Sequence, residues 1–310
     1  MKLLIEVPTW LGDAVMTTPA IENISKSFNK PQITIIGSKV SVQLFQNNPI
    51  VAKTFVLDKK YQSLFRFSRS IGSFDLFISF RGSFRSIILK FLISSKRKFQ
   101  FNEHKYKNLH QVEKYNNFVN DSLKIKSIPG RLNLVSKNSK VNNKSSKLSL
   151  GINPGASYGN AKQWLPERFA EVAIALSGDY EIFIFGSASE RKTTKDIEKL
   201  MTKKGVKNFK NLAGRTSIQD LINRISSLDL FITGDSGPMH IAATFNIPTV
   251  AIFGPTNELE TFQWKNDKSV ILKKTLQCQP CMQRSCPLKH HDCMKLIKVD
   301  NVLEAVKKVN

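Results

Sequence analysis

The chain has 310 residues, of which 41% are hydrophobic and 23% charged, and no apolar run approaches the ~20 residues that a membrane span requires. These values exclude a membrane-spanning chain and describe a soluble globular protein with room for two domains. The net charge of +23 is uneven, because residues 1–150 carry 25 Lys and Arg against 8 Asp and Glu, and this excess predicts an anionic partner for that half.

The N-terminus has the pattern of a first strand. Residues 1–6 include an acid, and Pro8 follows. A secretory signal peptide would carry neither an acid nor a proline at these positions. We therefore expect a cytosolic protein whose four cysteines are reduced.

The first half alternates apolar strands with amphipathic helices. We expect strands at 2–7, 32–37, 54–57 and 75–80, and helices at 14–28, 39–46, 59–70 and 83–93. This βαβα pattern predicts a parallel sheet with helices on both faces. Ligands bind at the carboxyl ends of strands in such sheets, where the turn that ends in Asp13 lies.

The polar segment Ser136–Ser149 predicts a boundary between two domains, at residues 1–147 and 148–310. A second series follows: strands at 148–152, 181–185, 230–233 and 249–253, and helices at 166–176, 190–202, 217–227 and 238–245. Two doubly wound Rossmann-like domains should then face each other across a cleft. We expect the last helix, at about 300–309, to pack back toward the N-terminal domain.

Asp13 follows Gly12 at the predicted start of a helix. One interpretation is an ordinary N-cap carboxylate. The other is a carboxylate held at a strand's carboxyl end, where it could act as a general base.

The loop Asn153–Trp164 contains small residues, including Ser157, that allow close approach of a ligand, and Lys162 offers a charge suited to a diphosphate. Glu190 follows the next strand, where an acid can bind a ribose diol. The alternatives are a solvated lysine and a first-turn glutamate that complements the helix dipole.

The stretch Leu230–Thr256 contains a Gly-rich turn, Gly234-Asp235-Ser236-Gly237, between a strand and a helix. It is either an ordinary strand-to-helix turn or a phosphate-binding site at a helix N-terminus. His240 lies one turn into the helix and should face the same pocket as Asp235. The chain has no Asp-x-Asp pair, so we expect no metal and no other cofactor. Lys162 and the positive ends of helices should instead stabilise the negative charge of a diphosphate.

Four cysteines, Cys278, Cys281, Cys286 and Cys293, cluster near the C-terminus with His290 and His291. The first pair has zinc-type spacing and the second pair does not. We favour reduced thiols that pack a compact loop over a zinc site.

Several segments together resemble the ADP-heptose:lipopolysaccharide heptosyltransferases. They are P-T-W-L-G-D-A-V-M-T-T-P-A at 8–20, N-P-G-A-S-Y-G-N-A-K-Q-W at 153–164, D-S-G-P-M-H-I-A-A at 235–243 and P-T-V-A-I-F-G-P-T at 248–256. The cysteine loop, C-Q-P-C-M-Q-R-S-C-P-L at 278–288 followed by H-H-D-C, is similar to that of the type II subgroup.

The resemblance implies a GT-B fold, an N-terminal domain for the acceptor, a C-terminal domain for the nucleotide-sugar, and inverting transfer of L-glycero-D-manno-heptose from ADP-heptose to a lipid-anchored inner-core heptose. It implies an enzyme that is cytoplasmic and peripheral at the anionic inner face of the inner membrane, with no nucleic acid as partner. By similarity, Asp13 is the general base. The donor-binding residues implied by similarity are Ser157, Lys162, Glu190, Thr216, Asp235, Ser236, Gly237 and His240.

Three alternatives stay open. The chain could be a type I or type III heptosyltransferase, or another GT-B enzyme with a different nucleotide-sugar. It could also be a basic nucleic-acid-binding module, although its N-terminal aromatic residues fall mostly on apolar strands and helix faces rather than among exposed basic residues.

Overall fold

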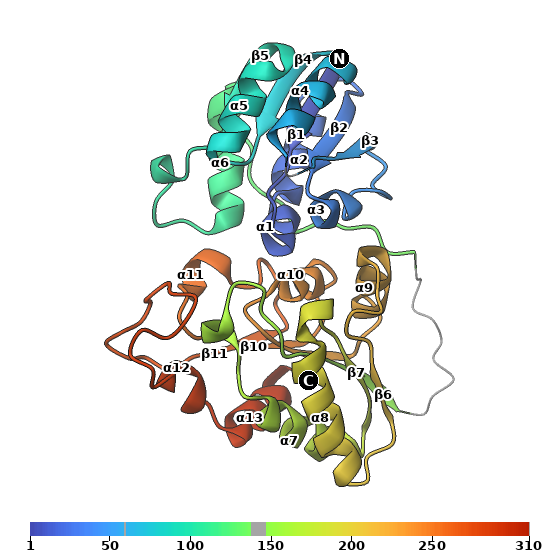
Figure 1. Ribbon diagram of the computed structural model, residues 1–310, viewed down its shortest axis with the longest axis vertical. Helices are drawn as coiled ribbons and strands as arrows, with labels where there is room; N and C mark the ends of the chain where they lie inside the picture. Colours follow the sequence, from blue (N-terminus) through green and yellow to red (C-terminus); the bar gives the residue numbers. More distant parts are fainter. Residues whose placement is uncertain (59, 138–146, 310) are drawn as a thin grey trace. The chain divides into compact units, whose positions relative to one another are not determined.

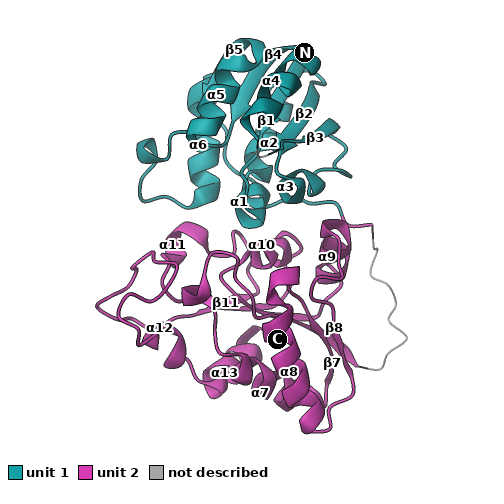
Figure 2. Cartoon of the chain, in the orientation of Figure 1, with its two compact units in different colours: residues 1–135 teal, residues 136–310 magenta. Residues whose placement is uncertain are grey.

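The computed structural model describes residues 1–58, 60–137 and 147–309. The chain forms two compact units, Met1–Val135 and Ser136–Asn310 (Figure 2). Ser136 and Lys137 belong to the second unit because the Ser136 hydroxyl, at 3.2 Å, and the Lys137 amide, at 2.9 Å, donate to the Asn223 side chain. The boundary thus falls earlier than the predicted 147/148, and residues 138–146 of the predicted boundary segment lie outside the described residues.

The described residues of the N-terminal unit contain one parallel five-stranded sheet with the order β3-β2-β1-β4-β5 (Figure 1). Its strands are β1 (Lys2–Glu6), β2 (Gln32–Gly37), β3 (Val51–Val56), β4 (Ser73–Ser79) and β5 (Ser94–Gln100). Its helices are α1 (Leu11–Met16), α2 (Thr18–Lys26), α3 (Lys39–Gln43), α4 (Tyr61–Ser70), α5 (Phe84–Leu92), the short η1 (Glu103–Lys105) and α6 (Gln111–Leu123).

The helix predicted at 14–28 is two helices, and the first begins earlier, at Leu11. The break falls at Thr17 because Pro19, near the start of α2, has no N–H to continue the ladder. The hydroxyls of Thr17 and Thr18 donate instead to the carbonyls of Ala14 and Val15, at 2.7 and 2.8 Å. The polypeptide therefore turns at this point with its backbone carbonyls still paired.

Helices cover both faces of this sheet. On one face, α4 and α5 contribute Leu64, Leu89 and Ile93 to a core that contains Leu4, Ile36 and Phe77 of the strands. The helices α1, α2, α3 and α6 contact one another, and right-handed crossovers put them on the other face. This unit is therefore doubly wound.

The described residues of the C-terminal unit contain a parallel six-stranded sheet with the order β11-β10-β9-β6-β7-β8. Its strands are β6 (Leu148–Asn153), β7 (Tyr180–Ile184), β8 (Phe209–Asn211), β9 (Leu230–Gly234), β10 (Thr249–Ile252) and β11 (Ser269–Leu272). Its helices are η2 (Asn160–Lys162), α7 (Pro166–Leu176), η3 (Ala188–Glu190), α8 (Arg191–Lys203), α9 (Ile218–Ile225), α10 (Gly237–Thr244), α11 (Glu258–Thr261), α12 (Asp292–Lys295) and α13 (Val299–Val309).

The last helix, α13, belongs to the core of the C-terminal unit. It contacts α7, β10 and β11, and its buried residues Val302, Ala305, Val306 and Val309 join one apolar cluster with α7 and α8. The apolar face of α13 is therefore used within its own unit, and packing of this helix toward the N-terminal domain stays a prediction.

The two parallel-sheet α/β units confirm the doubly wound fold class predicted from the sequence. The strands that were predicted lie mostly inside the sheets, where both faces are buried. None of the helices in the described part of the chain combines the length and apolarity needed to cross a bilayer.

Candidate functional site

The candidate site of the C-terminal unit lies at the carboxyl ends of β6 and β9, which are neighbours in the middle of the sheet. From β6 the chain continues to β7 on one side, whereas from β9 it continues to β10 on the other. In doubly wound sheets, ligands bind in the crevice that such a reversal of strand order opens. The loops that follow β6, β9 and β10 therefore share one edge.

Lys162, Asp235 and Thr256 come from these three loops and form one cluster. The Lys162 Nζ lies 2.5 Å from Asp235 Oδ2, and the Thr256 hydroxyl donates to the same oxygen at 2.6 Å. Both charged side chains are largely buried, with 12% and 5% exposed. The structure thus brings together two residues predicted from the sequence, Lys162 and Asp235, and adds Thr256.

The Lys162 ammonium also lies 4.6 Å from the centre of the Tyr158 ring, within range of a cation–π contact. The Arg284 guanidinium lies 5.3 Å from the same ring. Two cations therefore gather around Tyr158 beside the buried carboxylate of Asp235. Tyr158 and Arg284 were not predicted as site residues from the sequence, although an aromatic residue inside a Gly-rich loop indicates a possible ligand contact.

Ser236 and Gly237 form the start of α10, and Ser236 occupies the N-cap position with an extended backbone. Its hydroxyl does not cap the helix but lies 3.0 Å from the Thr233 hydroxyl and accepts from the Asn153 amide at 3.2 Å. The positive end of the α10 dipole therefore meets the same edge as the lysine. One turn further on, His240 is buried, with 3% exposed.

Glu190 lies against the loop after β6, because a Cβ on Gly155 would overlap its carboxylate. Only glycine at 155 leaves room for this approach. The Glu190 carboxylate accepts from the Ser187 amide at 2.6 Å as part of a capping box in the first turn of η3. The alternative predicted from the sequence was a first-turn glutamate that complements the helix dipole, and the capping box was not predicted. Ser157, on the same loop, is exposed.

Thr216 lies between β8 and α9, immediately before the capping residue Ser217, and is half-buried. The preceding turn contains Gly214 with φ of +65°. Arg191 at the start of α8 donates to the Gly214 carbonyl at 2.9 Å and ties this turn to the helix that follows Glu190. Thr216 thus belongs to the same edge of the sheet, two strands away from β6.

The cysteine loop is bonded to the loops of the candidate site. The Arg284 carbonyl accepts from the Ala161 amide at 3.1 Å, and the Met282 amide donates to the Pro255 carbonyl at 2.9 Å. The Tyr158 hydroxyl donates to the Met282 carbonyl at 2.6 Å. This loop therefore holds together the backbone on both sides of the Lys162–Asp235 pair.

The four cysteines are free thiols, and Cys293 is buried. Burial, followed by the charges of the other three cysteines, raises the pKa of the Cys293 thiol to about 11. Among the residues that the structure describes, no group of three or more His, Cys, Asp or Glu side chains is arranged to hold a metal ion.

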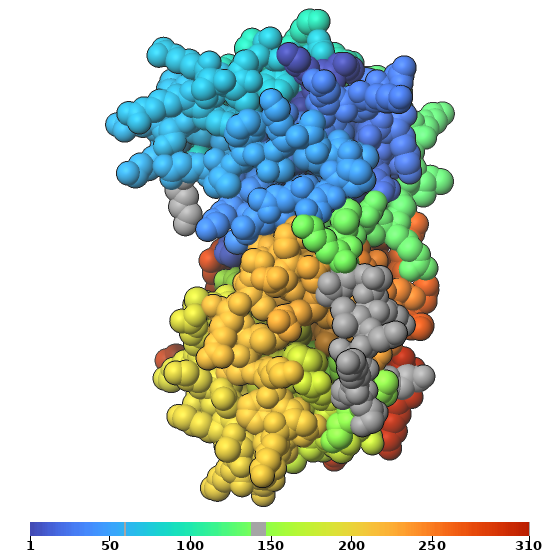
Figure 3. Space-filling view, turned by 90° about the vertical axis from the view of Figure 1, so that its right-hand side faces the viewer, coloured from blue at the N-terminus to red at the C-terminus, as the bar shows by residue number. Residues whose placement is uncertain are grey.

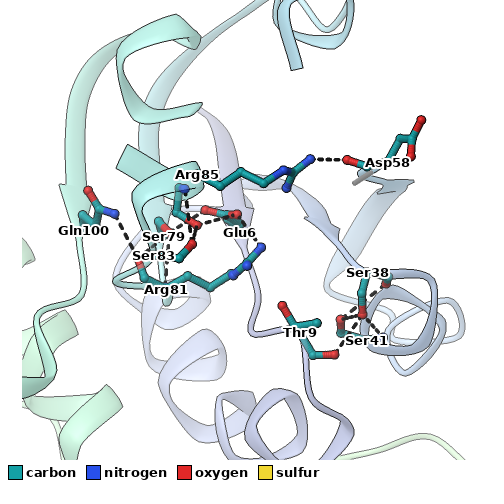
Figure 4. A network of polar contacts seen from close by, with 11 residues as sticks. Glu6, Thr9, Ser38, Ser41, Asp58, Ser79, Arg81, Ser83, Arg85 and Gln100 are labelled. Atoms are coloured by element: carbon teal, nitrogen blue, oxygen red, sulfur yellow. Dashed lines mark hydrogen bonds and ion pairs between the residues drawn. The ribbon is translucent and has the colours of Figure 1, made fainter. Parts of the chain in front are cut away.

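The N-terminal unit has a polar network at its own reversal of strand order, between β1 and β4 (Figure 4). Glu6, the last residue of β1, is fully buried and accepts from Arg81 at 3.1 Å, Ser79 at 2.6 Å and Ser86 at 3.0 Å. Burial raises the pKa of Glu6 above 4.5, although Arg81 and the two serines oppose the shift. This network was not predicted from the sequence, although an acidic residue inside an apolar strand could have indicated it.

Asp13 lies in the first turn of α1 and is half-buried. The N-cap position is Trp10, so the interpretation of Asp13 as the N-cap is wrong. The pKa of Tyr115 on α6 is well above 10, mainly because the ring is buried and then because of the Asp13 charge. Asp13 therefore faces α6 on the edge of the sheet that also carries Glu6.

Two doubly wound units, each with polar residues gathered where its strand order reverses, have the two-domain architecture of the GT-B fold. Comparison with solved structures supports this fold. The chain superposes on the ADP-heptose lipopolysaccharide heptosyltransferase II of Escherichia coli with a TM-score of 0.82 and 21% identity, covering 100% of this chain and 98% of that one. A glycosyltransferase family 9 structure from Veillonella parvula gives a TM-score of 0.85 at 20% identity, covering 99% and 96%.

Residues 64–291 match the profile of glycosyltransferase family 9 (heptosyltransferase). Lipooligosaccharide heptosyltransferase 2 of Campylobacter jejuni subsp. jejuni serotype O:6 is 41% identical over 316 residues, covering 100% of this chain and 99% of the relative. The enzyme of the same name from serotype O:2 is 40% identical over 313 residues, covering 99% and 98%. The chain belongs to glycosyltransferase family 9, the heptosyltransferases, as its sequence motifs had suggested.

Proposed function

We propose that this chain transfers L-glycero-D-manno-heptose from ADP-heptose to a heptose of the lipopolysaccharide inner core, with inversion at the anomeric carbon. The full-length similarity to two enzymes named lipooligosaccharide heptosyltransferase 2 supports this choice over a type I or type III enzyme. The observation that carries the proposal is the Lys162–Asp235–Thr256 cluster beside the first turn of α10. A lysine and a helix N-terminus at one point match the charge of a nucleoside diphosphate.

The C-terminal unit binds ADP-heptose in this proposal. Lys162, Ser157 and the start of α10 at Ser236 and Gly237 contact the diphosphate. Glu190 accepts from the ribose hydroxyls, and its position against Gly155 brings an acid next to the diphosphate loop. The remaining donor contacts are Thr216 at the adenine and Asp235 and His240 near the sugar.

Asp13 of the N-terminal unit acts as the general base. Its carboxylate accepts the proton of an acceptor heptose hydroxyl, and that oxygen attacks the anomeric carbon on the face opposite ADP. The bond between the anomeric carbon and the diphosphate breaks, and ADP leaves with both electrons of that bond. Lys162 and the positive end of α10 stabilise the departing charge without a metal ion.

The enzyme works in the cytoplasm as a peripheral protein at the inner face of the inner membrane, where its lipid-anchored acceptor is found. The excess of Lys and Arg in residues 1–150, a net charge of +17, favours association with anionic lipids and gives this half a role that does not require nucleic acid.

The test is incubation of the full chain with ADP-heptose and heptosyl-Kdo-lipid A, with the product mass as readout. We expect a gain of one heptose, and a far slower gain when Asp13→Asn replaces the wild type. Transfer to an acceptor that lacks the first heptose would point to a type I enzyme instead. Transfer only from a different nucleotide-sugar, or salt-sensitive binding of random DNA without turnover, would contradict the proposal.

A further inference from the structure

The outer surface of α4 and α5 carries large apolar side chains that the fold does not use. We name this surface the aromatic face, and its members are Tyr61, Phe65, Phe84, Ile87 and Phe91. Phe84 and Phe91 are 70% and 77% exposed, and Tyr61 and Phe65 are about half exposed, at 51% and 50%. Exposed apolar groups gathered in this way mark an interaction surface. The expectation that the N-terminal aromatic residues fall on apolar faces is therefore wrong for Tyr61, Phe65, Phe84 and Phe91, which are exposed.

Helical spacing explains why these residues share one surface. Tyr61 and Phe65 are four apart on α4, while Phe84, Ile87 and Phe91 follow the i, i+3, i+7 spacing on α5. Leu64 of α4, Leu89 of α5 and Ile93 at the C-cap of α5 pack in the core instead. The two helices contact each other, so their outer sides form one layer. In the space-filling view, the sky-blue surface around α4 projects at the upper left of the N-terminal unit (Figure 3).

Basic residues accompany the aromatic face. Residues 60–100 contain nine Lys and Arg and one acid, Asp75, and neither α4 nor α5 contains Asp or Glu. Asp75 is paired with Lys96 at 2.9 Å. Lys98 on β5 reaches the end of α5, where its ammonium donates to the Phe91 carbonyl at 3.4 Å. Asp58 lies just before α4, and its carboxylate accepts from the Ser63 hydroxyl at 3.0 Å. Basic residues therefore outnumber acidic ones around the apolar groups.

We propose that the aromatic face is the surface by which this chain docks on an anionic lipid bilayer. Phenylalanine side chains enter the boundary between headgroups and acyl chains, while Lys and Arg around them attract anionic headgroups. A second copy of the chain is a poorer occupant, because it would bring two basic surfaces together.

The aromatic face also starts at the edge of the sheet where the proposed acceptor residues lie. Tyr61 and Phe84 open α4 and α5, which follow the carboxyl ends of β3 and β4. Asp13 and the Glu6–Arg81 pair occupy the carboxyl end of β1, next to β4 in the sheet. Docking through this face would present a lipid-anchored acceptor to that edge, a consequence that rests on the proposed function.

The test measures binding of the full chain to vesicles of phosphatidylcholine alone or mixed with phosphatidylglycerol, at low and high salt. We expect binding only to the anionic vesicles, weakened by salt. The variant Phe65→Ser, Phe84→Ser, Phe91→Ser should bind roughly tenfold more weakly, since it removes three apolar anchors. These side chains are exposed, so the variant should keep the wild-type melting temperature.

Two matched controls distinguish binding through the aromatic face from binding through exposed apolar groups or positive charge elsewhere on the chain. The variant Ile128→Ser, Leu259→Ser, Leu288→Ser removes apolar groups that are at least 60% exposed elsewhere, and should bind like the wild type. Arg66→Gln, Arg69→Gln, Lys90→Gln should weaken binding, whereas the same change of charge at Lys192, Lys195 and Lys203 on α8 should weaken it less.

Turnover distinguishes this inference from the proposed function. The aromatic variant should keep transfer to a water-soluble acceptor oligosaccharide and lose transfer to acceptor in anionic vesicles. If the wild type uses neither acceptor, the proposed function is wrong. The vesicle-binding measurements then still show whether the aromatic face binds anionic lipid. The inference is overturned if the wild type binds neutral and anionic vesicles equally, or if the control variants lose as much vesicle binding as the aromatic variant. It is also overturned if the aromatic variant alone abolishes self-association or DNA binding.

Discussion

The Lys162 ammonium and the Asp235 carboxylate form an ion pair at 2.5 Å, with both side chains mostly removed from solvent. Thr256 donates to the same carboxylate oxygen. A buried carboxylate that keeps its charge needs such partners, because desolvation alone would favour the neutral form. The lysine proposed to bind the donor is therefore also part of the folded structure of its own loop, and its replacement should affect both properties.

Replacing Lys162 should reduce stability and activity together. Lys162→Met leaves Asp235 with Thr256 but without a countercharge, which should lower the free energy of unfolding by about 3 kcal/mol. Adding Asp235→Asn should recover part of this loss, because the uncompensated charge is gone. Urea denaturation of the two single variants and the double variant measures the coupling. Additive losses would show that the pair is not coupled, and unchanged ADP binding in Lys162→Met would contradict its donor role.

Removal of metal ions should leave the reaction nearly unchanged. The proposed leaving-group stabilisation uses the Lys162 ammonium and the N-terminal end of α10, which do not depend on a cation. Initial rates with and without excess EDTA provide the measurement. Complete loss of activity that magnesium restores would contradict this arrangement.

Asp13→Asn should separate catalysis from structure. Asparagine keeps the size of the side chain but cannot accept the acceptor proton as a base, so turnover should fall roughly 10²–10⁴-fold. Because Trp10 and not Asp13 occupies the N-cap position, the variant keeps the N-cap of α1 and loses a first-turn charge, and its melting temperature should hardly change. ADP-heptose affinity, measured by calorimetry, should also persist. Near-normal turnover would limit Asp13 to that helix-end role.

Glu6→Gln should change how stability depends on pH. Burial raises the folded pKa of Glu6 above the unfolded value of 4.5, so the folded state binds more protons between those two values. The contribution of Glu6 is thus fully present below 4.5 and is lost as pH rises through the folded pKa. The glutamine variant has no titrating group at this position, so its free energy of unfolding relative to that of the wild type should increase as pH rises above 4.5. If the free energies of unfolding of wild type and variant, measured by urea denaturation, depend on pH in the same way, Arg81 fully offsets the effect of burial on the Glu6 pKa.

Much of the fold could be predicted because the inner strands are continuous apolar runs. Sequences such as Leu230–Gly234 are buried on both faces and carry a strong signal. Three strands that the sequence analysis missed, β5, β8 and β11, lie at sheet edges. The S-S-K-R-K-F-Q sequence of β5 has three consecutive cations, as edge strands often do, and no alternating pattern. The helix α6 was missed because its capping box uses His110, an uncommon capping residue.

Site residues could be predicted where a single loop contained a recognisable motif. Contacts between loops that only the strand order brings together could not be predicted. Lys162 and Asp235 each stood in a Gly-rich turn. Their pairing, and the part that Thr256 plays, depend on β6, β9 and β10 being neighbours, which no local pattern shows. The approach of Glu190 to Gly155 likewise needs β6 and β7 side by side.

Replacing Cys286 and Cys293 with Ser should lower the melting temperature more than it lowers turnover per folded molecule. Cys293 belongs to the apolar core with α7 and α13, so a hydroxyl there is buried, whereas no proposed step of transfer uses a thiolate. With a pKa of about 11, Cys293 stays protonated at about pH 8 and should react slowly with iodoacetamide, as peptide mass spectrometry can show. Protein purified without chelators should contain little zinc. About one zinc per chain, released together with a large loss of stability, would show that these cysteines bind a metal.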